Sequence, residues 1–273
     1  MVAIYGPGAP NKYQSKRNRT WKGQAHRRLM ATANASINAG TIQHHLDALS
    51  LTQAEGEVST WPALIGADGA QANIAQKGDY GTNSWPDFGG PSVHYDTVGE
   101  ATKIAQADNA FGGAATVYAL CSSHKTLDAS GTALGFRSFW SGKGWKIYYD
   151  GPGRLITVAI GQAGAYQILE FDGYATQPRT VAFTGDAGLP EDEQVRVWID
   201  GVETTPDNYK GTGMVTTFPA GIIFLGAESN NDTTLASPLG GYVRLALAST
   251  EIPTDARIEQ LNNAAMWKVN SYG

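Results

Sequence analysis

The sequence predicts a mostly β protein, an antiparallel β-sandwich that follows a basic N-terminal arm and ends in a short C-terminal helix. From about residue 61 onward, apolar or alternating runs of roughly four to eight residues are separated by Gly, Asp, Asn and Pro. No long helical pattern stands between these runs, which argues against a parallel sheet with crossover helices. The 33 glycines and 12 prolines indicate turns rather than disorder, because 42% of the residues are apolar and only 16% are charged.

The N-terminal segment differs from the rest of the chain in charge. Residues 1–46 contain seven basic residues and no Asp or Glu, whereas the remaining 227 residues contain 13 basic and 25 acidic residues, a balance of -12. The seven basic residues are Lys12, Lys16, Arg17, Arg19, Lys22, Arg27 and Arg28. We expect residues 1–59 to form an anchoring arm and residues 60–273 to form the sandwich.

A short helix is expected within the arm, after the candidate N-cap Thr41. The apolar and aromatic residues at helical spacing are Ile42, His45, Leu46 and Leu49. A stripe this short does not form a stable isolated helix, so it is expected to pack on the sandwich or on another subunit.

Nine runs are predicted to be strands. They cover residues 114–120, 136–140, 146–149, 155–160, 166–171, 179–183, 194–199, 222–225 and 242–247. Asp-Gly pairs at 150–151, 172–173 and 200–201 favour hairpins between them, because both residues tolerate the backbone angles of tight turns. The sandwich is therefore expected to be built largely from neighbouring antiparallel strands.

A closing helix is predicted at the C-terminal end, after Pro253. Ile258, Leu261, Ala264 and Ala265 share one helical face there. We expect this helix to cover one edge of the sandwich.

Several motifs follow one another at a spacing known from one superfamily. QVRVWIDGV at residues 194–202 is an alternating strand that ends in an Asp-Gly hairpin, and GIIFLGAES at 221–229 and GYVRLALAS at 241–249 follow it. Residues 136–161 read as a central hairpin. Over about residues 85–270 this order resembles the laminin-G-like, concanavalin A-like lectin and glucanase superfamily. The resemblance implies a jelly roll of two sheets that binds ligands on its concave sheet or rim loops, in a fold shared by lectins, glucanases, adhesion modules and viral structural proteins.

The glucanase branch of that superfamily implies a strand motif Glu-x-Asp-x-x-Glu, which places an acid and a nucleophile on one face. Glu170 and Asp172 nearly match it, but Ala175 stands where the second Glu belongs. Residues 191–193 are three consecutive carboxylates in an expected loop, where solvation is the simpler explanation. We therefore expect no enzymatic activity and no catalytic residues.

Other catalytic and cofactor motifs are absent from the sequence. Neither a complete dinucleotide fingerprint, nor a Walker A loop, nor a Gly-x-Ser-x-Gly elbow occurs, so no cofactor is expected. His44 and His45 are expected to face different ways on the arm helix, with a pH-sensitive or metal-bridged subunit contact as the alternative. Cys121, the single cysteine, is expected to be a buried small residue rather than a nucleophile.

Aromatic residues are the better candidates for ligand binding, since the chain contains seven Trp and twelve Tyr. Trp85, Trp140 and Trp145 lie in Gly-rich or Pro-containing segments and are candidate ligand-binding residues together with Asn230. The alternative for the tryptophans is that they cap the two sheets as part of the core. Asn231 and Asp232 are candidate calcium ligands in an oxygen-rich loop, for which a simple turn is the alternative.

The opposite charges of arm and body favour an arm that ties one copy to acidic surface on a neighbour. The arm has few aromatic residues, Tyr13 and Trp21, and no reading motif, so no specific nucleic acid is expected as a partner. The longest apolar run is too short to span a membrane and no signal peptide is recognised, so neither membrane insertion nor signal-directed export is expected.

Together these features resemble a structural protein of a tailed-phage virion, either a tail or fibre component or a capsid-surface protein. The expected partners are other virion proteins, sibling subunits in a homo-oligomer and host cell-surface glycans, and the expected location is the virion. The alternatives are a carbohydrate-active enzyme, a glycoside hydrolase or lyase, and a free lectin.

Overall fold

The computed structural model describes most of the chain after residue 30. The described residues are 31–40, 42–48, 51, 56–58, 60–66, 69–70, 79–81, 92–95, 101–104, 111–125, 130–137, 143–151, 154–162, 164–173, 179–229 and 235–270. The seven basic residues of the arm lie outside this set.

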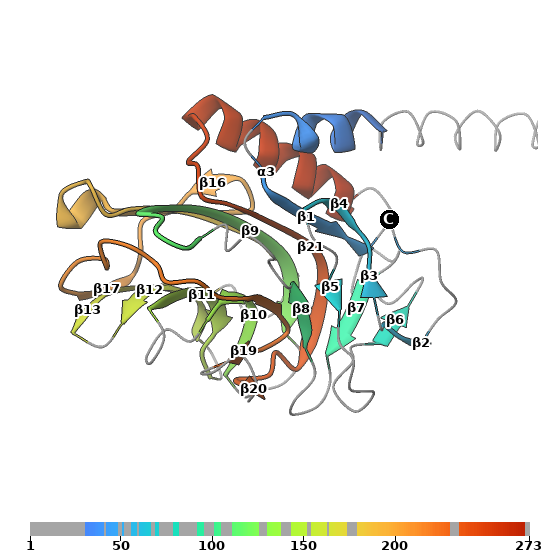
Figure 1. Ribbon diagram of the computed structural model, residues 1–273, viewed down its shortest axis with the longest axis horizontal. Helices are drawn as coiled ribbons and strands as arrows, with labels where there is room; N and C mark the ends of the chain where they lie inside the picture. Colours follow the sequence, from blue (N-terminus) through green and yellow to red (C-terminus); the bar gives the residue numbers. More distant parts are fainter. Residues whose placement is uncertain are drawn as a thin grey trace, which may run out of the picture.

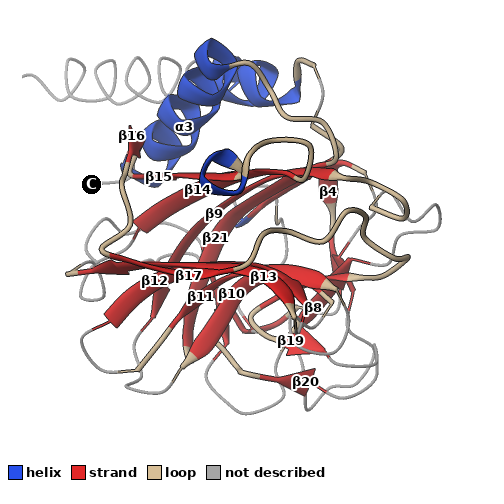
Figure 2. Ribbon diagram, turned by 90° about the vertical axis from the view of Figure 1, so that its left-hand side faces the viewer, coloured by secondary structure: helices blue, strands red, loops and turns tan. Residues whose placement is uncertain are grey.

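Two antiparallel sheets face each other in layers (Figures 1 and 2). The first sheet has ten strands in the order β16-β15-β14-β9-β21-β7-β6-β2, with β1 paired to β21 and β4 paired to β1. Its strands are β1 (His44–Asp47), β2 (Gly56–Glu57), β4 (Ala63–Ile65), β6 (Asp79–Gly81), β7 (Ser92–Tyr95), β9 (Thr116–Lys125), β14 (Arg179–Asp186), β15 (Val195–Ile199), β16 (Val202–Glu203) and β21 (Gly241–Ser249).

The second sheet has nine strands in the order β17-β13-β12-β11-β10-β18-β8-β5-β3. Its strands are β3 (Thr60–Trp61), β5 (Gly69–Ala70), β8 (Thr102–Ile104), β10 (Gly131–Phe136), β11 (Gly144–Tyr149), β12 (Arg154–Gln162), β13 (Ala165–Asp172), β17 (Asn208–Gly211) and β18 (Ile223–Leu225). A further pair, β19 (Glu228–Ser229) and β20 (Leu235–Ala236), stands apart, and a short 3-10 helix, η3 (Glu191–Glu193), precedes β15.

The core lies between the sheets, where alternate residues of facing strands point inward. Phe111, Phe136, Trp145 and Phe183 pack there with ring centroids 5.1 to 6.1 Å apart. The predicted antiparallel jelly-roll β-sandwich is therefore confirmed, and so are eight of the nine predicted strands, with shifted ends.

Two helices cover the outer face of the first sheet (Figure 1). One is α3 (Asp255–Asn270), the predicted closing helix, and the other spans residues 31–38. Ile37, Ile258, Leu261 and Ala265 pack there against outward-facing residues of β9, β14 and β21. The C-terminal helix thus covers a face of the sheet rather than the expected edge.

The helix expected after Thr41 is wrong, because this segment forms strand β1. Residues 44–47 pair with residues 248–245 of β21, and all four of them are buried. Pairing with a strand that lies far along the chain outweighs the local helical spacing. Since β1 and β2 both belong to the first sheet, the sandwich begins before the expected boundary at residue 60.

The strand expected at residues 136–140 does not continue through Arg137, because β10 ends at Phe136. Arg137 leaves the strand with a φ of 52°, and residues 138–140 lie outside the described set. The sequence analysis did not predict strand β10, because glycines at 131 and 135 interrupt its pattern of side chains. Gly131 is needed there, since a Cβ at this position would lie 2.4 Å from the carbonyl oxygen of Pro238.

Candidate functional site

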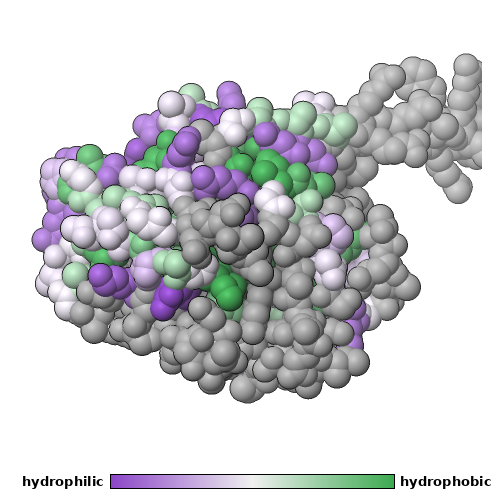
Figure 3. Space-filling view, viewed as in Figure 1, coloured by the Kyte–Doolittle hydropathy of each residue, from purple (hydrophilic) through white to green (hydrophobic). Residues whose placement is uncertain are grey.

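A groove of about 450 Å³ lies where the two sheets end side by side, at the strands β16 and β17. We call it the edge groove. It is lined by Leu169, Asp192, Val195, Arg196, Val197, Glu203, Thr204, Thr205 and Pro206. In Figure 3, hydrophilic residues are spread over the left-hand end of the molecule, without a large apolar area between them.

One wall of the edge groove is the crossover segment, residues 203–207, which runs from the first sheet to the second. Its backbone is fixed at both ends. The amide of Thr204 donates to the carbonyl of Val197 at 2.8 Å, and the amide of Asp207 donates to the carbonyl of Glu170 at 2.9 Å. The Asp207 carboxylate also accepts from the amide of Asp172 at 2.8 Å. The groove wall is thereby tied to both sheets.

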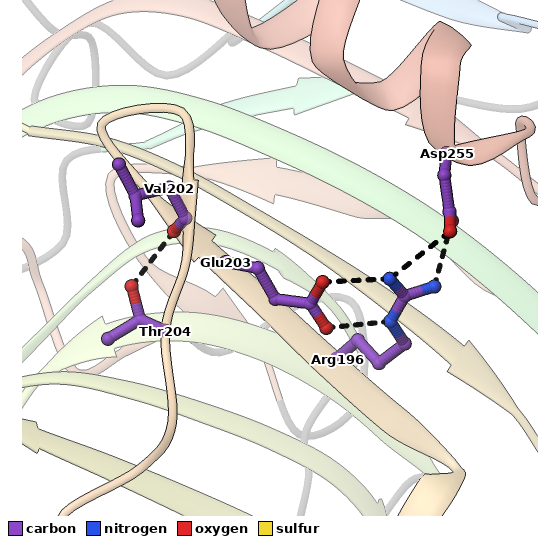
Figure 4. Close-up of polar contacts among 5 residues, drawn as sticks. All are labelled: Arg196, Val202, Glu203, Thr204 and Asp255. Carbon is purple, nitrogen blue, oxygen red and sulfur yellow. Dashed lines mark hydrogen bonds and ion pairs between the residues drawn. The ribbon is translucent and has the colours of Figure 1, made fainter.

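Arg196 holds this end of the first sheet together (Figure 4). Its Nε and Nη2 atoms donate to the two carboxylate oxygens of Glu203, each at 2.8 Å, and its Nη1 donates to Asp255 at 2.8 Å. These hydrogen bonds, to Glu203 first and then to Asp255, raise the pKa of Arg196 above its ordinary value. The bonds from Arg196 to Glu203 lower the pKa of that carboxyl, against a smaller opposing effect of the Asp255 charge. Glu203 is therefore an ionised, fixed acceptor beside the groove.

Tyr209 lies next to the edge groove, paired in register with the groove residue Leu169. It is one of the few large hydrophobic side chains exposed among the described residues, at 42%, and its hydroxyl donates to Glu191 at 3.2 Å. Partial burial, followed by the charge of Glu191, raises the pKa of the phenol. The ring is therefore neutral and oriented by a hydrogen bond.

The turn that carries Asp192 is attached to the second sheet through Gln167. The side-chain nitrogen Nε2 of Gln167 donates to the backbone carbonyl of Glu191 at 2.6 Å and to Oε1 of Gln194 at 2.9 Å. That Gln194 oxygen also accepts from the amide of Met214 at 2.7 Å. These bonds hold η3 against β13, although its three acidic side chains are exposed. The predicted loop of carboxylates is thus a short 3-10 helix at a defined position.

The near match to the glucanase motif faces away from the edge groove. Glu170 lies on β13 next to Leu169 and so points to the opposite face. Its carboxylate is buried and accepts from Lys210 Nζ at 2.8 Å and from Asn208 Nδ2 at 2.6 Å. Asp172 is exposed at the end of β13, and Gly173 follows it with a φ of 88°. Ala175 lies outside the described residues.

Of the residues predicted to bind a ligand, only Trp145 falls within the described part of the chain. Its side chain is fully buried, with Phe111, Phe136 and Phe183 around its ring, so it belongs to the core. Trp85, Trp140 and Asn230 lie outside the described residues. The same is true of the candidate calcium ligands Asn231 and Asp232, and within the described ranges no three His, Cys, Asp or Glu side chains are grouped to hold a metal.

His44 and His45 lie on a strand and are both buried. Burial lowers the pKa of His44 to about 4, and burial together with the charge of Lys268 lowers the pKa of His45 to about 3. The Nδ1 atom of His45 lies 2.7 Å from Oδ1 of Asn38 in the helix above. Both imidazoles are therefore neutral near pH 7 and act as packed core residues.

Cys121 is buried on β9, as the sequence predicted. Burial raises the pKa of its thiol to about 12. The thiol is consequently protonated and unreactive near neutral pH.

Sequence reasoning did not identify Thr204, Thr205 or Tyr209. The run Thr-Thr-Pro-Asp at 204–207 looks like an ordinary turn, and only the pairing of β13 with β17 brings it to the groove. Nothing in the local pattern distinguishes Tyr209 from the other eleven tyrosines.

Comparison with known proteins shows similarity in fold only. No protein-family model and no curated protein matches the sequence. Domain 4 of an extracellular arabinanase from Geobacillus stearothermophilus, solved in complex with arabinotriose, is similar with a TM-score of 0.53 and 13% identity, over 81% of this chain and 98% of that one. The binding domain of botulinum neurotoxin serotype D is similar with a TM-score of 0.54 and 13% identity, over 85% of this chain and 53% of that one.

A sialidase from Trypanosoma rangeli is similar with a TM-score of 0.53 and 14% identity, over 86% of this chain. The chain spans only 38% of that sialidase, and 53% of the toxin domain. These likenesses and the strand order define the class of the fold, which is a lectin-like jelly-roll β-sandwich. No helix in the described part of the chain is long and apolar enough to cross a membrane.

Proposed function

We propose that this protein is a non-enzymatic binding protein whose edge groove holds an oligosaccharide. The observation that carries the proposal is the composition of the groove. Its apolar members Leu169, Val195 and Val197 are only 4%, 8% and 1% exposed, whereas Asp192, Thr204 and Thr205 bring polar groups to it from the turn and the crossover segment. A sugar carries a rim of hydroxyls, which matches this polar lining.

The size of the groove and its neighbouring aromatic ring support this proposal. A volume of about 450 Å³ lies within the range of roughly 300–1,000 Å³ that is usual for small-molecule sites. The exposed ring of Tyr209 offers an apolar surface beside the groove and can stack on a second sugar. The arabinanase domain with the same fold was solved with arabinotriose.

Binding without turnover is proposed because glycoside hydrolysis needs two cooperating carboxyl groups, one of them protonated. Glu203 in the edge groove accepts two hydrogen bonds from Arg196, which lower its pKa and keep it ionised. Glu170 on the other face is paired with Lys210 and Asn208. Neither group is suited to donate a proton to a leaving oxygen.

The test is to screen the full-length protein on oligosaccharides and to measure affinity calorimetrically for Asp192→Asn and Glu193→Gln. The two variants lose the same charge on the same exposed turn, but only Asp192 lines the groove. Loss of a charged acceptor weakens a hydrogen bond by about 1.5 kcal/mol, so we expect about tenfold weaker binding for Asp192→Asn. Glu193→Gln is expected to bind like the wild type. Absence of any glycan affinity contradicts the proposal, and release of reducing ends contradicts its non-enzymatic part.

We further propose that the protein works in a tailed-phage virion, with its basic arm anchoring it to virion proteins or sibling subunits. The charge difference between residues 1–46, at +7, and the remaining 227 residues, at -12, supports this role. Arg257 donates to the carbonyls of Ser36, Ile37 and Ala39, so the part of the arm that follows its seven basic residues is fixed to α3.

Removal of residues 1–29 tests the anchoring role, because it leaves the helix at 31–38 in place. The shortened protein is expected to keep its fold and its glycan affinity and to be lost from assembled particles. Incorporation of the shortened protein at the wild-type level contradicts the anchoring role.

A further inference from the structure

The end of the sandwich that carries the edge groove is strongly acidic. Residues 186–207, all of which the structure describes, contain seven carboxylates and a single basic residue, Arg196. The carboxylates are Asp186, Glu191, Asp192, Glu193, Asp200, Glu203 and Asp207. Seven negative charges and one positive charge leave this segment at -6.

Arg196, the one basic residue that lines the groove, is already paired with carboxylates of the chain. Arg196 donates to both oxygens of Glu203 and to Asp255. Outside the groove lining, Lys210 is paired with Glu170 at 2.8 Å on the other face of the second sheet, and Arg179 is paired with Asp200 at 2.5 Å. Most N–H groups of the Arg196 guanidinium already donate to Glu203 and Asp255, so an anionic ligand in the groove would have to compete with these two carboxylates for it.

The polar groups of the groove are mostly acceptors. Asp192 and Glu203 accept only, when ionised. The Thr204 hydroxyl donates its proton to the carbonyl of Val202 at 2.9 Å, which leaves its oxygen to accept (Figure 4). A ligand that matches this lining must mainly donate, as sugar hydroxyls do and as carboxylate and sulfate groups cannot.

We infer that the edge groove selects oligosaccharides without acidic groups and rejects those that carry carboxylate or sulfate groups. This inference rests on the proposed glycan binding and adds the chemical class of the ligand. The rejection has two causes, repulsion by the acidic segment and the loss of hydrogen bonds between ligand acceptors and groove acceptors. The repulsion is expected to weaken as salt screens the charges, whereas the hydrogen-bond mismatch is not.

The test compares sugars that differ only in an acidic group. Suitable pairs are lactose with sialyllactose, and galacto-oligosaccharides with galacturono-oligosaccharides of the same length. Binding to the full-length protein is measured by calorimetry at low and at moderate ionic strength. We expect the neutral member of a pair to bind at least tenfold more tightly, and the ratio to fall as salt is added.

Two matched variants identify the groove as the source of the selectivity. Asp192→Lys reverses a charge in the lining, and Glu193→Lys makes the same change one residue away, outside it. The first is expected to reduce the preference for the neutral sugar about tenfold, and the second to reduce it much less.

The two proposals fail in different ways. Equal or tighter binding of the acidic sugars by the wild-type protein overturns the selectivity and leaves glycan binding intact. No binding of either member of any pair overturns glycan binding itself. Equal effects of the two lysine variants overturn the assignment of the selectivity to the edge groove.

Discussion

Arg196 and Glu203 face each other across the β15–β16 hairpin, with both oxygens of the carboxylate 2.8 Å from guanidinium nitrogens. Asp255, the first residue of α3, takes a third hydrogen bond from the same guanidinium at 2.8 Å. One arginine therefore joins a wall of the edge groove to the helix that covers the first sheet. Changes at Arg196 are expected to affect both stability and ligand binding.

Replacement of Arg196 by Met is expected to lower the free energy of unfolding by about 1 kcal/mol, measured by urea denaturation at pH 7. The value is modest because the side chains of Arg196, Glu203 and Asp255 are 37%, 51% and 74% exposed, so water screens the pairs. The folded pKa of Glu203 lies below its ordinary value of 4.5. The contribution is therefore complete above that pH and is lost as the pH falls through the folded pKa. Wild type and variant should converge in acid, and a constant difference contradicts the ion-pair explanation.

The ion pair between Lys268 on α3 and Asp47 on β1 is expected to matter more for stability. Both side chains are only 1% exposed, so loss of one partner leaves a buried charge without its counterion. Lys268→Met is expected to cost about 3–5 kcal/mol in denaturant unfolding, and the double variant with Asp47→Leu considerably less. If the double variant loses as much stability as the single variants Lys268→Met and Asp47→Leu lose together, the two charges do not act as a pair.

The two buried histidines predict a loss of stability in mild acid. Their folded pKa values, about 4 for His44 and about 3 for His45, lie below the ordinary value of 6.5. The unfolded chain therefore binds more protons below pH 6.5, and stability is complete above that pH and falls as the pH drops toward the folded values. The expected slope is on the order of 1 kcal/mol per pH unit for each histidine. His44→Gln/His45→Gln should flatten the dependence of Tm on pH between 6.5 and 4.5, and an unchanged slope contradicts this origin.

The sequence predicts the sandwich well because its signals are local. A strand such as β15 shows its alternation in five residues and its turn in the next two, Asp200 and Gly201. β1 gives no such signal, since its conformation depends on β21, about 200 residues later. The candidate site depends even more on distant parts of the chain. The edge groove combines a strand of the second sheet, the turn at Asp192 and the crossover segment, which only the folded chain brings together.

The indole of Trp145 gives a second example, because the sequence leaves its role open. A tryptophan that follows a Gly-Lys-Gly segment fits an exposed binding loop as well as a core position, and the packing of the buried rings of Phe111 and Phe183 around it shows that it belongs to the core. Burial depends on the packing of both sheets. No local pattern contains that information.

Trp145 and Tyr209 are expected to separate stability from binding. Trp145→Ala removes a fully buried ring and should lower the free energy of unfolding by about 3–5 kcal/mol, while the folded fraction keeps its glycan affinity.

Tyr209→Ala removes a ring that is 42% exposed beside the edge groove. It should cost less than about 1 kcal/mol in stability and weaken glycan binding about tenfold. Tyr209→Phe is the control for the ring, since it loses only the hydroxyl that donates to Glu191. If the Tyr209→Ala variant binds as the wild type does while the Asp192→Asn variant does not, the sugar contacts the groove alone and does not extend over the ring.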